Sequence, residues 1–124
     1  SVFDAVGESG LSLYKFGKTT SLPKWQDNFK PTSYMDVIAE NKKINAHTLL
    51  LIDIGLGFDD CKKQLKETGL KEKVVICSRL GIKSRFYYDV LDKIDASKIK
   101  TPYCIIIPGK MSEVEEESLM LIVK

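Results

Sequence analysis

The feature that most constrains the fold is a regular alternation between short apolar runs and amphipathic stripes, which starts at Pro31. The apolar runs are rich in Leu, Ile and Val, and such runs are typical of strands that are covered on both faces. Between them, apolar residues recur every three or four positions, as they do along one face of a helix. Strands that alternate with helices predict an α/β fold, a layered domain with a central sheet flanked by helices.

Both kinds of element can be placed along the chain. We expect strands at residues 19–22, 47–54, 74–77 and 103–107. We expect helices at residues 1–11, from Pro31, at about 58–68, at about 84–94 and from Ser112. The helix at 84–94 rests on an apolar stripe of Phe86, Val90, Leu91 and Ile94. Ser112 and Glu115 have the spacing of a capping box, and Ser33 and Asp36 have the same spacing after Pro31.

Length and charge exclude several classes of protein. The 124 residues are enough for one domain, with 44% hydrophobic and 29% charged residues, which excludes a disordered chain. The net charge of +2 is too small to indicate a nucleic-acid or membrane partner. No apolar run approaches the roughly 20 residues of a membrane-spanning helix. We therefore expect a folded cytoplasmic domain, and since the chain opens on Ser rather than Met without a leader pattern, it can be a fragment.

The cysteines indicate no cross-link and no metal centre. Cys61, Cys77 and Cys104 are odd in number, far apart, and contain no Cys-x-x-Cys pair. This pattern fits buried thiols in a reducing compartment better than a disulfide framework or a zinc site. We expect no metal.

Four local patterns could carry chemistry, and each has a simpler structural explanation. The loop Ile54-Gly-Leu-Gly57 could approach a phosphate, but Asp60 stands where a third glycine would be needed, so a plain turn is favoured. His47 is the only His and is expected to be a hydrogen-bonded structural residue rather than a base. The acidic turn at residues 113–117 is expected to be solvated, and the lysines between 15 and 30 to be snorkelling side chains.

Three blocks of sequence nevertheless resemble the C-terminal half of the diphthine synthases, methyltransferases of the tetrapyrrole-methylase type. The first is SVFDAVGESGLSLYKFG at residues 1–17. The second runs from PTSYMDVI at residues 31–38 to HTLLLIDI at residues 47–54. The third is PYCIIIPGK at residues 102–110. The words YKFG and HTL are uncommon, which makes the resemblance specific.

The resemblance implies a transferase that uses S-adenosylmethionine and releases S-adenosylhomocysteine. Members of that family methylate the modified histidine of translation elongation factor 2 in diphthamide biosynthesis. They have two α/β domains with the cofactor in the cleft between them, the C-terminal one having a mixed sheet, and they form homodimers. The catalytic residues stay unknown from the sequence.

The resemblance also implies cofactor contacts, carried over position by position. These contacts are Ser1, Val2, Ile52, Leu80 and Tyr103. Leu80 stands where the family has a small residue, and Tyr103 replaces a His, so that an aromatic ring and a polar tip remain without the same hydrogen-bond geometry. Contacts through backbone amides would survive both changes.

The N-terminal glycine-rich strand end and G-D-P segment of the family have no counterpart in residues 1–124. We therefore expect the C-terminal domain of a longer enzyme, inactive alone because half a cleft cannot align a nucleophile with a methyl group. The alternative is a non-enzymatic α/β interaction domain that kept the fold and lost the cofactor, which the changes at Leu80 and Tyr103 favour.

Overall fold

A five-stranded mixed sheet forms the centre of the molecule. The structure is a computed structural model that describes residues 2–81 and 83–124. The sheet order is β1-β2-β5-β3-β4, with β1 parallel to β2 and every other pair antiparallel. The strands are β1 (Thr20–Leu22), β2 (Thr48–Ile52), β3 (Val74–Ser78), β4 (Arg85–Asp89) and β5 (Cys104–Ile107). The α/β fold with a mixed sheet is thus confirmed.

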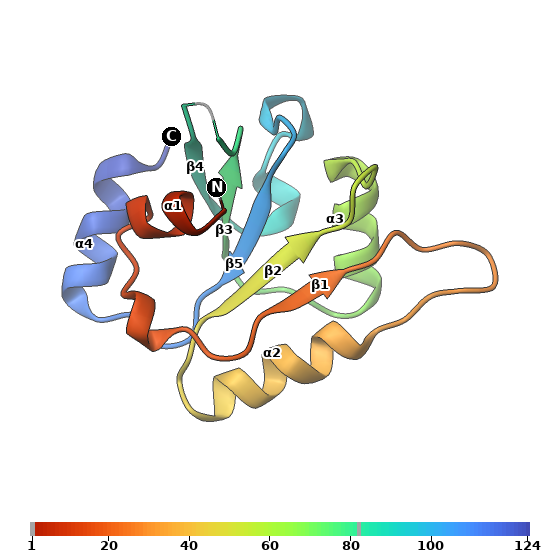
Figure 1. The fold of residues 1–124 in the computed structure, drawn as a ribbon, viewed down its shortest axis with the longest axis horizontal. Helices are drawn as coiled ribbons and strands as arrows, with labels where there is room; N and C mark the ends of the chain where they lie inside the picture. Colours follow the sequence, from red (N-terminus) through yellow and green to blue (C-terminus); the bar gives the residue numbers. More distant parts are fainter. Residues whose placement is uncertain (1, 82) are drawn as a thin grey trace.

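Helices cover both faces of this sheet (Figure 1). The α-helices are α1 (Val2–Glu8), α2 (Ser33–Lys43), α3 (Phe58–Glu67) and α4 (Glu113–Ile122). Three short 3-10 turns complete the described elements: Leu13–Lys15, Leu91–Lys93 and Ala96–Lys98. None of the described helices is both long enough and apolar enough to cross a membrane.

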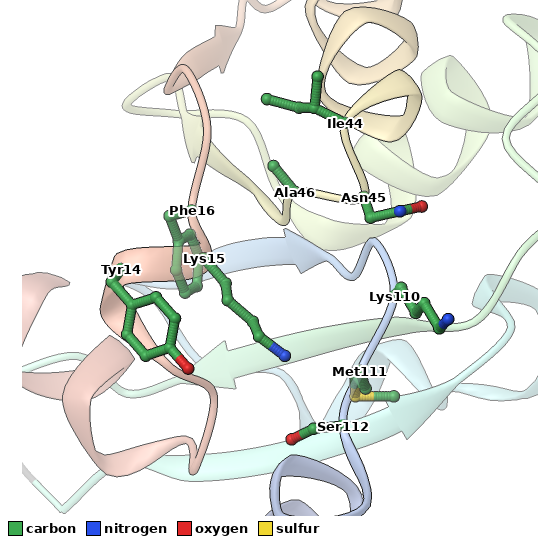
Figure 2. A pocket seen from close by; sticks show the side chains of 9 residues that line it. All are labelled: Tyr14, Lys15, Phe16, Ile44, Asn45, Ala46, Lys110, Met111 and Ser112. Carbon is green, nitrogen blue, oxygen red and sulfur yellow. The ribbon is translucent and has the colours of Figure 1, made fainter.

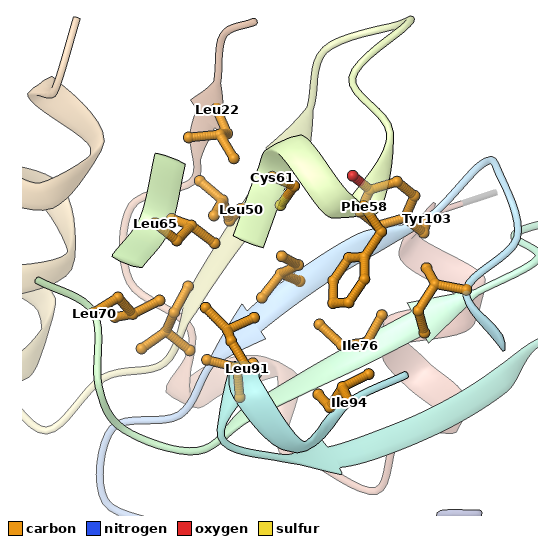
Figure 3. Close-up of a cluster of buried hydrophobic side chains, with 14 of the residues drawn as sticks. Leu22, Leu50, Phe58, Cys61, Leu65, Leu70, Ile76, Leu91, Ile94 and Tyr103 are labelled. Carbon is orange, nitrogen blue, oxygen red and sulfur yellow. The ribbon is translucent and has the colours of Figure 1, made fainter. Parts of the chain in front are cut away.

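Two apolar clusters fill the space between the sheet and its helices. The first lies between the sheet and α2 and α3, where Leu50, Leu65 and Ile76 are fully buried (Figure 3). The second lies on the other face, where Ala5 of α1 and Leu119 of α4 pack over Val75 and Ile106. Alternate residues of a strand point to opposite faces, so β5 supplies Ile105 to the first cluster and Ile106 to the second.

The three cysteines are free and buried, as the sequence predicts. Burial raises the pKa of the Cys61 thiol to about 12. Contact with Cys104 on the neighbouring strand, together with burial, raises the pKa of Cys77. Neutral buried thiols of this kind pack as small apolar side chains.

The predicted helix at 84–94 is wrong. Residues Arg85–Asp89 form β4, which pairs antiparallel with β3, and Leu91–Lys93 form a single 3-10 turn. Phe86 and Tyr88 face the second cluster while Tyr87 faces the first, which is the two-residue period of a strand. Aromatic residues favour strands, and the pairing with β3 outweighs the helix-like spacing of the apolar residues.

The ends of the other elements refine the predictions. The capping box at Ser112 and Glu115 is present. By contrast, Ser33 is inside α2 and Thr32 precedes the helix without a side-chain cap, so the predicted box with Asp36 does not form. β2 ends at Ile52, and Ile54 beyond it is fully exposed at 101%.

The two outermost strands of the sheet, β1 and β4, differ. β1 is only three residues long. Beside β4, the end of the chain adds an isolated parallel bridge between Val123 and Phe86, and the Lys124 amide donates to the Phe86 carbonyl at 2.9 Å.

We expect Leu65→Ala to lower the free energy of unfolding by about 2–5 kcal/mol, because it leaves a cavity in the first cluster. Leu121→Ala, at a Leu that is 86% exposed on α4, should change it by less than about 0.5 kcal/mol. Urea unfolding followed by circular dichroism measures both. Equal losses for the two variants would contradict the described packing.

Candidate functional site

The topology brings three of the predicted cofactor residues to one side of the sheet, where β2 and β3 end and β5 begins; we call this side the strand-end edge. β5 lies between β2 and β3 and runs antiparallel to both, so its start meets their ends (Figure 1). Ile52 is the last residue of β2, Leu80 follows the end of β3 by two residues, and Tyr103 precedes β5. These three positions, up to 51 residues apart in sequence, therefore become neighbours at the ends of adjacent strands.

A pocket of about 400 Å³ opens at this edge. We call it the strand-end pocket; it is lined by residues 52–56, which follow β2, and residues 101–103, which precede β5. Ile52 and Tyr103 are thus in its wall. Val2 and Leu80 are not: both belong to the second cluster, where Val2 is partly buried and Leu80 is 7% exposed. Ser1 lies outside the described residues.

Tyr103 braces the pocket from within the core. Its hydroxyl donates to the Leu56 carbonyl at 2.8 Å, and its ring contacts the Phe58 ring edge-on with 5.7 Å between centroids. The residue is 5% exposed, and burial raises the pKa of its hydroxyl, so the group stays a neutral donor. The polar tip expected from the sequence is therefore already engaged by the protein's own backbone.

Leu80 contributes to this edge through its backbone. Its amide donates to the Pro102 carbonyl at 2.8 Å, and the Arg79 amide donates to the Lys100 carbonyl at 3.0 Å. These two bonds hold the segment after β3 against the segment before β5. Leu80 therefore helps to place residues 101–103 in the pocket wall without lining it.

The loop 53–57 is a turn with an open outer face. The Leu56 amide bonds to the Asp53 carbonyl at 3.1 Å, and Gly55 has a positive φ of 90° that favours glycine. The Asp53 carboxylate accepts from the Lys24 amide at 3.1 Å. No cation lines the strand-end pocket among the residues described, which suits a neutral or cationic ligand with a large apolar part better than a phosphate.

A second hollow, of about 470 Å³, lies at the opposite edge of the sheet (Figure 2). It is lined by residues 14–16, 44–46 and 110–112. Figure 2 shows Lys15 reaching across it toward Ser112. The hollow lies over a buried network of charged groups that the sequence did not reveal.

His47 and Glu115 are the centre of this network. The Nε2 atom of His47 lies 2.8 Å from Oε2 of Glu115, and the two side chains are 0% and 1% exposed. The Gly109 amide donates to Nδ1 of His47 at 2.9 Å. Because Nδ1 must accept, Nε2 carries the hydrogen and donates it to the carboxylate. His47 is thus a hydrogen-bonded structural residue, as predicted.

Glu115 is not solvated, which corrects the expectation for the acidic turn. Oε1 accepts from Lys15 Nζ at 2.8 Å and from the Ser112 amide at 2.9 Å, and Oε2 also accepts from the Ser12 amide at 2.9 Å. Burial alone would raise the carboxyl pKa, but these donors and His47 outweigh it and lower the pKa from 4.5 to about 2. The hydrogen bond to Glu115 in turn raises the pKa of Lys15.

The network is distant from the strand-end pocket, because His47 precedes β2 and Gly109 follows β5. Within the network, His47 and Lys15 are 68 and 100 residues away from Glu115 in sequence. The one sequence signal for this network is the capping box, which predicts that the Glu115 side chain bonds back to the Ser112 amide. It predicts none of the other partners of Glu115. The residues described contain no group of three His, Cys, Asp or Glu side chains suited to a metal ion.

The chain is similar to proteins of known family over almost all of its length. No family model matches it. Diphthine synthases from Methanococcus maripaludis and Methanocaldococcus jannaschii are 37% and 35% identical, each aligned over 96% of this chain and over 53% and 54% of their own length. The diphthine methyl ester synthase of Yarrowia lipolytica is 56% identical over 54 residues, which is 44% of this chain and 18% of that protein.

Solved structures give the same result. A crystal structure of a diphthine synthase superposes with a TM-score of 0.82 at 25% identity, covering 99% of this chain and 51% of the other. A structure from Entamoeba histolytica with the same, provisional, assignment gives a TM-score of 0.85 at 27% identity, covering 100% of this chain and 57% of the other. The chain spans about half the length of the relatives that it matches.

The buried carboxylate makes stability depend on pH in a defined direction. A carboxyl pKa of 4.5 when unfolded and about 2 when folded stabilises the fold by about 3 kcal/mol above pH 4.5, and this contribution is lost as the pH falls toward 2. We expect Glu115→Gln to lack this part of the acid dependence and to be less stable at neutral pH. Urea unfolding between pH 2 and pH 7 measures it. Glu117→Gln, exposed on the same helix, is the control, and an equal effect there would contradict the assignment.

Proposed function

Because the chain is homologous to a C-terminal portion of diphthine synthase, we propose that it is the substrate-side domain of such an enzyme. The enzyme would methylate the modified histidine of translation elongation factor 2 in diphthamide biosynthesis, with S-adenosylmethionine as the methyl donor. The observation that carries the proposal is the strand-end pocket, which has Ile52 and Tyr103 in its wall.

The pocket supports this cofactor by its size and its chemistry. Its volume of about 400 Å³ is within the range of small-molecule sites. Ile52, Leu56 and Pro102 give it apolar walls against which a flat purine can pack. Asp53 and the exposed turn at Gly55 add acceptors and backbone amides at the rim, where a ribose or an ammonium group can bond.

The residues of this chain would bind, orient and exclude water. When bound, S-adenosylmethionine supplies a methyl group on a sulfonium sulfur, and its loss to an amine nitrogen leaves S-adenosylhomocysteine. Tyr103 holds the turn at Leu56 in place through its hydroxyl, and Leu80 holds residues 101–103 through the Pro102 carbonyl. Such positioning is what methyl transfer needs most from a protein, because alignment supplies most of the rate. None of the described side chains is assigned a role as acid, base or nucleophile.

We further propose that the cleft is completed by the part of the enzyme that this chain does not span. The fully exposed Ile54 at the rim supports this, since a large apolar side chain beside a pocket is typical of a surface that another unit covers. The chain alone is then inactive, and the full enzyme is a cytoplasmic homodimer. Free buried cysteines are consistent with that reducing compartment.

The alternative, a non-enzymatic interaction domain that kept the fold, is favoured by one observation. The Leu80 side chain is buried in the second cluster, and the Tyr103 hydroxyl already donates to the Leu56 carbonyl, so neither group is free to bond to a ligand. The two functions differ in whether the full-length protein binds the cofactor.

The deciding experiment uses the full-length protein that contains this chain. Titration calorimetry should show binding of S-adenosylmethionine, and tritium from its methyl group should appear in elongation factor 2 that carries the modified histidine. No binding would reject the enzyme in favour of the interaction domain. Binding with transfer to a tetrapyrrole and none to the translation factor would reject the substrate. The melting temperature of the isolated chain should rise little when the cofactor is added.

We expect Ile52→Arg in the full-length protein to weaken cofactor binding about tenfold or more, because a long cation fills the apolar strand-end pocket. Ile44→Arg is a matched control at a residue that is 72% exposed at the opposite edge of the sheet. Calorimetric Kd values for both variants test this, with circular dichroism to show that each is folded. Unchanged binding in Ile52→Arg would remove this pocket from the proposal.

A further inference from the structure

A groove of about 360 Å³ lies on the same side of the sheet as the strand-end pocket and is lined by cationic side chains. We call it the basic groove; its lining residues are Arg79, Arg85, Tyr87, Lys98, Lys100 and Lys124. They come from the end of β3, from β4, from the segment before β5 and from the end of the chain. No Asp or Glu side chain lines the groove among the described residues.

The cations of the basic groove are also unpaired. Within the described part of the chain, none of them forms an ion pair with a carboxylate, whereas lysines elsewhere do. The paired lysines are Lys15, Lys18, Lys42 and Lys66, with Glu115, Glu40, Glu72 and Asp92. In a chain with a net charge of only +2, such a concentration of unpaired positive charge creates a local field that attracts anions.

The groove is firmly built and adjoins the strand-end pocket. The Lys100 amide donates to the Ser78 hydroxyl at 2.7 Å, and the Arg79 amide donates to the Lys100 carbonyl at 3.0 Å. Lys100 lines the groove, and the next residue, Thr101, lines the strand-end pocket. Arg79 also lines the groove, and the amide of the residue after it, Leu80, bonds to Pro102 of the pocket wall. A chain lying in the groove would therefore pass directly beside the proposed methyl donor.

We propose that the basic groove docks an acidic segment of the protein substrate and so delivers the residue to be methylated. This inference rests on the proposed function. Two arginines can bind carboxylates in bidentate fashion, and Tyr87 and the lysine stems provide apolar contact for an extended peptide. A nucleic acid fits less well, because its backbone needs a long track of cations and the charge of this chain is balanced beyond the groove.

The test reverses two charges at the exposed residues Arg85 and Lys98 in the full-length enzyme, as Arg85→Glu with Lys98→Glu. The control variant, Lys43→Glu with Lys71→Glu, makes the same change in net charge at two exposed lysines near the opposite edge of the sheet. We expect the groove variant to raise KM for the protein substrate about tenfold at low salt and to flatten its salt dependence. Its kcat and its Kd for S-adenosylmethionine should match those of the control.

A binding measurement keeps this test independent of turnover. Fluorescence anisotropy with labelled octaglutamate should show binding to the wild-type enzyme and to the control, and about tenfold weaker binding to the groove variant. Equal behaviour of the two variants in KM and in octaglutamate binding would overturn the proposal. So would tighter binding of an oligothymidylate that the groove variant loses. Failure of the wild-type enzyme to methylate the translation factor would reject the proposed function, while the octaglutamate result would still test the groove.

Discussion

The direction of β5 is the constraint on which the rest of the structure depends. Because β5 runs antiparallel between β2 and β3, it joins two strands that point the same way and brings its own start to their ends. One edge of the sheet therefore gathers the turn after β2, the turn after β3 and the segment before β5. The strand-end pocket and the basic groove are both built from these connections, while the strands themselves contribute mainly to the two clusters. The strands thus form a rigid layer that positions the loops around both hollows.

At the opposite ends of the strands, beneath the second hollow, buried charged groups hold the chain segments together. Glu115 accepts hydrogen bonds from four partners, which belong to the segment before β2, the segment after the first helix and the start of α4. A carboxylate with this many donors is stable in a buried place, since each donor replaces a bond to water. The network fastens α4 to the sheet at the ends of the strands that lie away from the strand-end pocket.

Local signals in the sequence predicted a large part of this fold. The short apolar runs at 74–77 and 103–107 are typical of buried strands, and Ser112 marks the start of α4 as the first residue of a capping box. β4 was not predicted because Phe86 and Val90, four residues apart, fit one face of a helix as well as one face of a strand. Only the pairing with β3 decides between helix and strand. For the candidate site, the resemblance pointed to Ile52 and Tyr103, but the engagement of the Tyr103 hydroxyl by Leu56 and the ion pair of Lys15 with Glu115 depend on contacts between distant segments. No local pattern encodes such contacts.

The two outermost strands, β1 and β4, affect how the sheet can interact with other chains. An unpaired strand is a template on which another chain can extend the sheet, and proteins commonly blunt such strands. β1 offers only three residues, and at the other end Val123 and Lys124 already bond to Phe86 of β4. In the described part of the chain, the short β1 and the bridge at Phe86 of β4 both blunt these strands. Addition of a strand from a second molecule, and the fibrous aggregates that such continuous sheets seed, are therefore disfavoured.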